Sequence, residues 1–106
     1  MKIVRTSAFD RSVAKAGASR AEVDALELAL AANPDAGDVI PGMHGARKVR
    51  FAMRGKGKRG GGRCIYVVMR SDDMVFLLLA YAKADQEDMT QAQRQRVAAL
   101  MEAINE

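Results

Sequence analysis

A nine-residue apolar run, Met74 to Ala82, is the feature that most limits how this chain can fold. The run is too short to cross a bilayer as a helix, which needs about 20 apolar residues. It follows the turn sequence Ser71-Asp72-Asp73. These features predict a strand, extending to Lys83, that lies at the centre of a sheet and is buried on both faces.

Two further strands are predicted just before this one. Val49, Phe51 and Met53 alternate with Lys48, Arg50 and Ala52, which gives the period of two expected of a half-buried strand. A second strand is predicted from Arg63 to Arg70. The connections between the three strands are too short for parallel crossovers, so the segment is predicted to form an antiparallel meander.

The remaining elements are predicted from spacing and capping signals. Lys2 to Arg5 reads as a first strand, and the spacing of Phe9 and Val13 suggests a short helix ending at Gly17. A capping box at Ser19 to Glu22 starts a second helix, which stops at Asn33-Pro34. A third helix follows the capping sequence Thr90 to Gln93.

Residues 35–45 are predicted to form a loop. The chain is therefore expected to be one α+β domain over residues 1–106, in the order β-α-α-β-β-β-α, with an antiparallel sheet packed by helices.

Positive charge is concentrated in one part of the chain. Nine of the 17 Lys and Arg residues lie between Arg47 and Arg70, a stretch without Asp or Glu. This stretch carries +9 and the rest carries −5, for a net charge of +4. Its centre, Arg54 to Arg63, interleaves five cations with five glycines. A cationic, glycine-rich segment suits a polyphosphate partner, so RNA or DNA is the leading candidate ligand.

Several classes of site are excluded by spacing. Lys56 is followed by Gly57 rather than Ser or Thr, so the loop is not a Walker motif. No group of His, Cys and carboxylates has metal-ligand spacing, and no acidic residue lies between Val39 and Ser71, which argues against a two-metal nuclease. Nothing else marks the lone His44 as catalytic.

The single Cys64 excludes an internal disulfide and suits a reducing cytoplasm, and without a histidine partner it is expected to pack rather than react. The first residues lack the apolar core of a signal peptide. These features predict a cytoplasmic protein with no membrane association.

The element order, the basic strand, the Gly/Lys/Arg loop and the Tyr-x-Lys at the end of the apolar strand together resemble the RelE/ParE toxin superfamily, most of all its HigB-like branch. The resemblance covers the chain from about Asn33 to its end. The segments that carry it are Asn33-Pro-Asp-Ala-Gly-Asp-Val-Ile40, Gly45-Ala-Arg-Lys-Val-Arg50, Gly55-Lys-Gly-Lys-Arg-Gly-Gly-Gly-Arg63 and Leu79-Ala-Tyr-Ala-Lys83.

The resemblance implies the toxin of a type II toxin-antitoxin system. Such a protein is an mRNA endoribonuclease that cleaves mRNA in the ribosomal decoding site without metal or cofactor, inhibits translation, and is held inactive by a cognate antitoxin. By motif position, Arg63 is implied to lie near the scissile phosphate, with Tyr81 and Lys83 as site residues. The final helix offers only Arg94 and Arg96, so the resemblance leaves the general acid unassigned.

The residues themselves fit this chemistry. Attack of the RNA 2′-hydroxyl on the adjacent phosphorus needs alignment, charge stabilisation and proton transfer, and an Arg such as Arg63 can donate two hydrogen bonds to phosphate oxygens. Lys83 or the loop residue Lys58 could supply a proton or further charge, and Tyr81, on the same strand face as Lys83, could stack on a base. Five further cations are predicted RNA contacts: Lys48, Arg50, Arg54, Lys56 and Arg59.

Two other functions remain compatible with the sequence. The same cations would serve a non-catalytic RNA-binding or ribosome-binding module equally well. A ParE-like protein would instead use the basic strands to contact gyrase.

Overall fold

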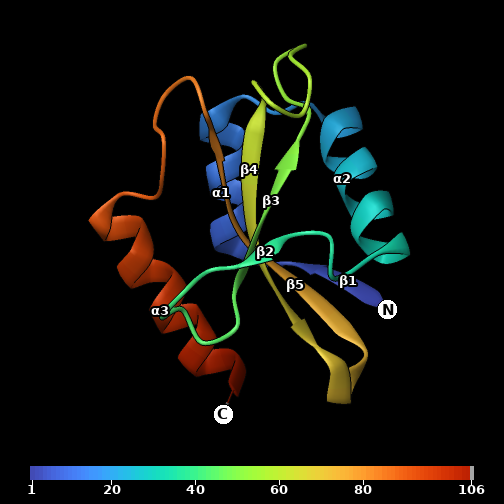
Figure 1. Cartoon of the computed structure of the whole chain (residues 1–106), viewed down its shortest axis with the longest axis vertical. Helices are drawn as coiled ribbons and strands as arrows, with labels where there is room; N and C mark the ends of the chain where they lie inside the picture. Colours follow the sequence, from blue (N-terminus) through green and yellow to red (C-terminus); the bar gives the residue numbers. More distant parts are fainter. Residues whose placement is uncertain (106) are drawn as a thin grey trace.

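The structure, a computed structural model, describes residues 1–105. The elements are β1 (Lys2–Arg5), α1 (Ser7–Ala16), α2 (Arg20–Ala32), β2 (Asp38–Val39), β3 (Arg47–Phe51), β4 (Gly62–Met69), the short 3-10 helix η1 (Arg70–Asp72), β5 (Met74–Ala82) and α3 (Gln91–Asn105). The predicted α+β class is confirmed, and the predicted helices and long strands are all present (Figure 1).

The five strands form one sheet in the order β1-β5-β4-β3-β2. Strands β3, β4 and β5 form the predicted antiparallel meander. The sequence did not predict the pairing of β1, which lies parallel to β5 at the edge of this meander. Two helices lie between β1 and the meander, which gives the chain enough length for a parallel connection.

The predicted loop at residues 35–45 contains the two-residue strand β2, which pairs with β3 through Asp38 opposite Lys48 and Val39 opposite Arg47. A strand of two residues has no readable periodicity, so the sequence pattern could not reveal it.

Apolar side chains cover both faces of the sheet. On one face, helices α1 and α2 contribute Phe9 and Leu30 to a cluster that includes Tyr66 of β4. On the other face, Val97 and Met101 of α3 pack in a second cluster. Figure 1 shows α2 and α3 on opposite sides of the strands. Strand β5 is buried along most of its length, as its composition predicts.

The helix starts follow their predicted caps. The Ser19 hydroxyl accepts the Glu22 N–H and the Glu22 carboxylate accepts the Ser19 N–H, which confirms the capping box of α2. Thr90 and Gln93 form the same reciprocal pair before α3. Helix α1 begins at Ser7, with Thr6 as its N-cap, and ends at Ala16; the C-cap is Gly17, whose φ of 84° suits glycine.

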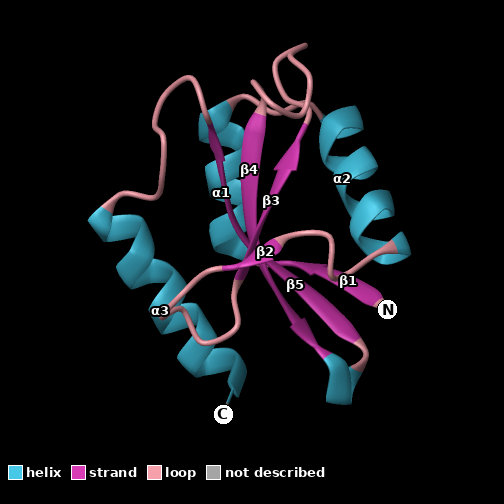
Figure 2. Cartoon of the chain, in the orientation of Figure 1, coloured by secondary structure: helices cyan, strands magenta, loops and turns pink. Residues whose placement is uncertain are grey.

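The connection between β3 and β4, residues 52–61, is here called the glycine-rich loop. Figure 2 shows it as a loop that extends beyond the ends of the strands. None of the helices in residues 1–105 combines the length and the apolar character that crossing a membrane requires.

Candidate functional site

Four of the predicted site residues line one groove, here called the cationic groove. It has a volume of about 680 Å³ and lies where β3, β4 and the glycine-rich loop meet. Its lining residues are Ala36, Asp38, Lys48, Val49, Arg50, Lys58, Arg63 and Glu87. Two strands and a loop therefore bring together Lys48, Arg50, Lys58 and Arg63, which are separated by up to 15 positions in the sequence.

The register of the sheet fixes the centre of this groove. Arg50 lies directly opposite Arg63, and Arg63 lies directly opposite Tyr81, so the three form one row across β3, β4 and β5. Arg63 is two residues before Ile65, which packs on the α3 side, so the row faces that side of the sheet. Like charges in directly opposed positions destabilise a sheet, so stability alone does not account for this pair of arginines.

Arg63 is buried, with 7% of its surface exposed. Its guanidinium donates hydrogen bonds to the carbonyl oxygens of Gly62 (2.9 Å), Arg59 (3.2 Å) and Lys58 (3.3 Å). No carboxylate within residues 1–105 forms an ion pair with it. A buried cation held only by carbonyl dipoles keeps its charge uncompensated, and this arrangement costs free energy. Arg63 therefore orders the glycine-rich loop and keeps a positive charge at the base of the groove.

The concentrated charge that the sequence shows is partly neutralised by acidic residues from elsewhere in the chain. Four of the nine cations form ion pairs: Arg47 and Arg70 with Asp35, Arg54 with Asp85, and Lys48 with Asp88. Five have no carboxylate within 4.0 Å in the described part of the chain: Arg50, Lys56, Lys58, Arg59 and Arg63. The nine cations therefore do not form a uniform surface.

Arg54, a predicted RNA contact, is engaged within the fold. Its Nε donates to the Ala16 carbonyl at the end of α1 (2.7 Å), and its two terminal nitrogens donate to the Asp85 carboxylate (2.8 and 3.3 Å). Arg54 thus ties α1 to the segment after β5. Lys56 and Arg59 are exposed on the glycine-rich loop and do not line the cationic groove.

Tyr81 lies beneath the groove. Its ring packs in the cluster on the α3 side and is 2% exposed, so it is not available to stack on a base as the sequence suggested. Its hydroxyl is buried and has no hydrogen-bond partner among the described residues. Burial raises the pKa of Tyr81 to about 12, and nearby Asp88 also raises it, whereas Arg63 and Arg94 lower it. The hydroxyl is therefore a protonated donor without an acceptor.

Lys83 directly follows β5 and is exposed. Its backbone N–H donates to the carbonyl of Gly61 (3.0 Å), which places it beside the glycine-rich loop. It is not among the residues that line the cationic groove.

The sequence did not indicate the role of the segment before α3. The Asp88 carboxylate accepts the Met89 N–H (2.8 Å) and a hydrogen bond from Arg94 (3.0 Å), and lies 3.6 Å from the Lys48 ammonium. The Met89 N–H makes the largest contribution to lowering the pKa of Asp88. This carboxylate therefore joins α3 to the groove strand β3. No local sequence signal predicts this contact, because it depends on how α3 packs.

The other reactive side chains lie elsewhere. His44 borders a cavity with Met101, Glu102 and Asn105 of α3 and does not line the cationic groove. Cys64 is fully buried, which raises the pKa of its thiol. Residues 1–105 contain no group of three His, Cys, Asp or Glu side chains arranged to hold a metal ion.

Comparison with known proteins gives a matching protein family and similar solved structures. A family model described as the RelE toxin of the RelE/RelB toxin-antitoxin system matches residues 1–106. A solved structure of a mutant of the E. coli toxin RelE in the free state is similar with a TM-score of 0.53. The sequence identity is 16%, and the match covers 81% of this chain and 86% of that chain. At this identity the structural match concerns the fold alone.

Proposed function

The chain belongs to the RelE family of toxins of toxin-antitoxin systems, and from this membership we propose that it is a ribosome-dependent mRNA endoribonuclease. The observation that best supports the proposal is the pair of directly opposed arginines, Arg50 and Arg63, which have no carboxylate partner in residues 1–105. An RNA phosphate in the cationic groove would supply the missing negative charge.

In the proposed reaction, the 2′-hydroxyl oxygen attacks the adjacent phosphorus and the bond from phosphorus to the 5′-oxygen breaks. The products are a 2′,3′-cyclic phosphate and a 5′-hydroxyl. Arg63 and Arg50 stabilise the charge that develops on the phosphorane oxygens. Tyr81 lies directly opposite Arg63 beneath the groove and helps to position this arginine.

The proton transfers are assigned to lysines at the edge of the groove. Lys58 reaches it from the glycine-rich loop, and Lys83 lies beside that loop through its backbone bond to Gly61. Either ammonium can protonate the leaving 5′-oxygen, while solvent water takes the proton of the 2′-hydroxyl and later returns a proton to the lysine. The ribosome holds the mRNA in its decoding site and so supplies the alignment that in-line attack requires. The exposed Lys56 and Arg59 contact the RNA backbone, and no step uses a metal ion.

Within the family we place the chain in the HigB-like branch. The support is the basic glycine-rich loop followed by the Tyr81-Ala82-Lys83 segment. We further propose that the chain is a single domain, because one sheet carries both apolar clusters. We also propose that it acts in the cytoplasm and is held inactive by a cognate antitoxin.

The test is cleavage of mRNA in a purified translation reaction, read by mapping the new 5′ ends. We expect Arg63→Lys and Arg50→Gln each to lower the cleavage rate by about 100-fold or more, since each removes a donor to the phosphorane. Arg70→Gln is the matched control, because Arg70 belongs to the same basic stretch but pairs with Asp35 outside the groove. An mRNA with 2′-deoxy nucleotides at the cleavage site should remain intact.

The alternatives predict different results. Salt-sensitive RNA binding without any product would support a non-catalytic binding module. Inhibition of gyrase with intact mRNA would support a ParE-like activity. Unchanged cleavage by both Arg63→Lys and Arg50→Gln would show that the site lies elsewhere.

A further inference from the structure

The outer edge of β5 has a strand partner along only part of its length. β1 pairs with β5 from Met74 to Leu77, and no strand of residues 1–105 pairs with the same edge from Leu78 to Ala82. Helices α1 and α3, which pack on opposite faces of the sheet, flank this part of the edge (Figure 1). The Ser12 hydroxyl of α1 accepts the Ala80 N–H (2.9 Å), so α1 is held against the strand there.

Two cavities lie along this edge between α1 and α3. One, at the beginning of α1, has a volume of about 490 Å³, and the other, beside Leu79 of β5, has a volume of about 360 Å³. Both are lined by Arg11 of α1 and Arg96 of α3, so the two cavities meet at these side chains. The pair of cavities, with the cations Arg5, Arg11, Lys15 and Arg96 that line them, is here called the arginine seam. It shares no residue with the cationic groove and is therefore a separate surface.

The cations of the seam gather in a part of the chain that is acidic overall. Outside the stretch from Arg47 to Arg70, the chain has eight Lys and Arg residues and all 13 Asp and Glu residues. Four of these eight cations line the seam, whereas no Asp or Glu of residues 1–105 lines it. Surfaces that serve solubility alone mix charges of both signs. The separation of charge at the seam therefore needs another explanation.

Three of the four cations are free to bind a ligand. Arg5 is engaged, because its guanidinium donates hydrogen bonds to two carboxylates of α2. Arg11, Lys15 and Arg96 are exposed, and no carboxylate of residues 1–105 lies within 4.0 Å of their charged groups. Lys15 follows Arg11 by one helical turn, so the two lie on the same face of α1.

A neutral hydrogen-bond donor lies beside these cations. The side-chain oxygen of Gln93, which lines the seam one turn before Arg96, accepts the Thr90 N–H (2.9 Å) and a hydrogen bond from Gln86 (2.7 Å). The amide NH₂ of Gln93 has no acceptor among the described residues. A guanidinium can donate two parallel hydrogen bonds to phosphate oxygens. The seam thus offers donors and positive charge from two helices, which is the chemistry that recognises phosphate.

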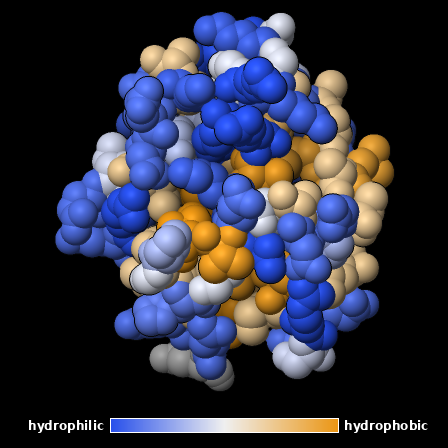
Figure 3. Space-filling model, viewed as in Figure 1, coloured by the Kyte–Doolittle hydropathy of each residue, from blue (hydrophilic) through white to orange (hydrophobic). Residues whose placement is uncertain are grey.

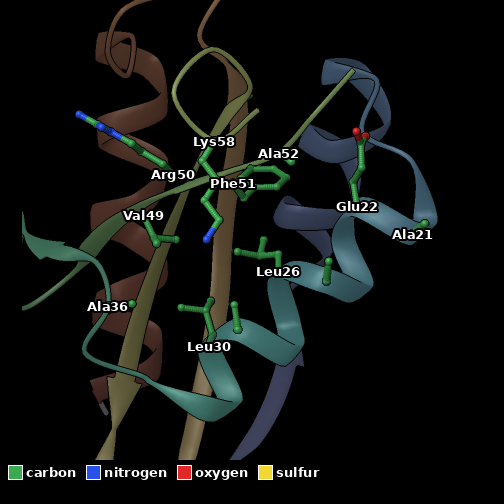
Figure 4. A pocket seen from close by; sticks show the side chains of 12 residues that line it. Ala21, Glu22, Leu26, Leu30, Ala36, Val49, Arg50, Phe51, Ala52 and Lys58 are labelled. Atoms are coloured by element: carbon green, nitrogen blue, oxygen red, sulfur yellow. The ribbon is translucent and has the colours of Figure 1, made fainter. Parts of the chain in front are cut away.

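The cavity between α2 and β3 has a different character. Its volume is about 310 Å³, and Figure 4 shows Leu26 and Leu30 of α2 facing Phe51 of β3 across it. Apolar surface is visible beside α2 in Figure 3. The two cations that line this cavity, Arg50 and Lys58, also line the cationic groove. The seam is therefore the place, apart from the cationic groove, where free cations from different elements converge.

We propose that the arginine seam is a second phosphate-binding site, whose ligand is a chain of linked phosphates. Arg11 and Arg96 bind neighbouring phosphates from the two helices, and Lys15 adds charge along the chain. Linked phosphates of this kind occur in the phosphodiester backbone of a nucleic acid and in free polyphosphates, and both present the same oxygens to the seam. Binding there does not depend on the nuclease activity proposed for the cationic groove, so its test is separate from the cleavage assay.

The test is a titration of the isotope-labelled full chain with sodium tripolyphosphate, followed by the NMR signals of the backbone amides. The Ser12 and Gln93 amides should shift and reach saturation. The double variant Arg11→Gln, Arg96→Gln should weaken the binding that these amides report by about tenfold or more, because both bidentate donors are lost. The Arg50 amide reports binding in the cationic groove separately, and the affinity measured there should not change.

Arg20→Gln is the matched control. Arg20 is an exposed cation at the start of α2 that lines neither cavity of the seam, so this variant should bind tripolyphosphate like the original chain. Substitutions of exposed side chains rarely disturb a fold, and unchanged amide signals in β4 and β5 would show that each variant is folded. A 2′-O-methyl RNA oligonucleotide is the second probe. If it shifts the seam amides at a lower concentration than tripolyphosphate, the ligand is a nucleic acid backbone; if tripolyphosphate alone shifts them, the ligand is a free polyphosphate.

Two outcomes would overturn the proposal. In the first, neither probe shifts the Ser12 and Gln93 amides while the Arg50 amide responds, so phosphate binds only in the cationic groove. In the second, Arg20→Gln weakens binding at the seam amides as much as the double variant does. The attraction would then come from the overall positive charge of the chain and not from a site.

Discussion

Two buried tyrosines differ in whether their hydroxyls are satisfied. The Tyr66 hydroxyl accepts the Gly37 N–H (2.9 Å) and donates to the Pro34 carbonyl (2.7 Å), so it ties the segment after α2 to β4. The Tyr81 hydroxyl has no partner in residues 1–105. One hydroxyl therefore joins two parts of the fold, and the other makes no hydrogen bond within the described residues.

Replacing each tyrosine by phenylalanine separates these roles. Tyr66→Phe should lower the free energy of unfolding by about 1–3 kcal/mol, because it leaves a buried N–H unsatisfied. Tyr81→Phe should change it by less than about 1 kcal/mol, since no hydrogen bond is lost. Urea unfolding measures both. If Tyr81→Phe destabilises the fold as much as Tyr66→Phe, its hydroxyl has a partner in solution.

At the residue scale, the sequence indicated which cations belong to a basic site, but not which of them other parts of the fold would bind. Lys48, Arg50, Lys58 and Arg63 were predicted site residues, and they do line one groove. Arg54 belongs to the same basic stretch but is engaged by the end of α1 and by Asp85. Spacing along the chain cannot distinguish these cases, because the partners come from distant segments.

At the scale of elements, two glycines of the glycine-rich loop differ in the space around them: Gly61 has no room for a side chain, whereas Gly57 has room for one. A Cβ on Gly61 would lie 2.6 Å from the Phe51 carbonyl oxygen and 2.7 Å from the Met53 nitrogen. A Cβ on Gly57 would have no atom within 4 Å. The loop is thus packed against the end of β3 at Gly61, next to the carbonyls that hold Arg63.

We therefore expect Gly61→Ala to displace the loop and Gly57→Ala to leave it in place. Because backbone atoms cannot move aside as a flexible side chain can, Gly61→Ala should lower the free energy of unfolding by about 1–3 kcal/mol. It should also reduce RNA cleavage through the displaced Arg63. Thermal unfolding and the cleavage assay check both effects, and equal behaviour of the two variants would contradict this account.

The helices and the long strands could be predicted from the sequence, but only some of the strand pairings could. Caps at Ser19 and Thr90 marked two helix starts, and short connections required the antiparallel meander. The parallel pairing of β1 with β5 and the two-residue strand β2 were not predicted. Both depend on contacts between distant segments, which local periodicity does not encode.

At the scale of the whole molecule, the distribution of unpaired cations determines how salt affects RNA binding. Each phosphate contact on single-stranded RNA contributes about 0.7 to the slope of log affinity against log salt concentration. Arg50→Gln should reduce this slope by about 0.7, because Arg50 has no ion pair in residues 1–105. Arg54→Gln should leave it unchanged, because Arg54 already pairs with Asp85.

The measurement is a titration with a 2′-O-methyl RNA oligonucleotide, which binds without being cleaved. Equal slopes for the original chain and Arg50→Gln would mean that RNA does not occupy the cationic groove. A lower slope for Arg54→Gln would mean that its ion pair opens on binding.

The parallel pairing of β1 with β5 has a consequence for how this chain is made. β1 pairs with β5, which lies far from it in the sequence, and α1 and α3 both pack against β5. β1 is hydrogen-bonded to β5 alone, so this edge of the sheet can close only after β3, β4 and β5 have been made.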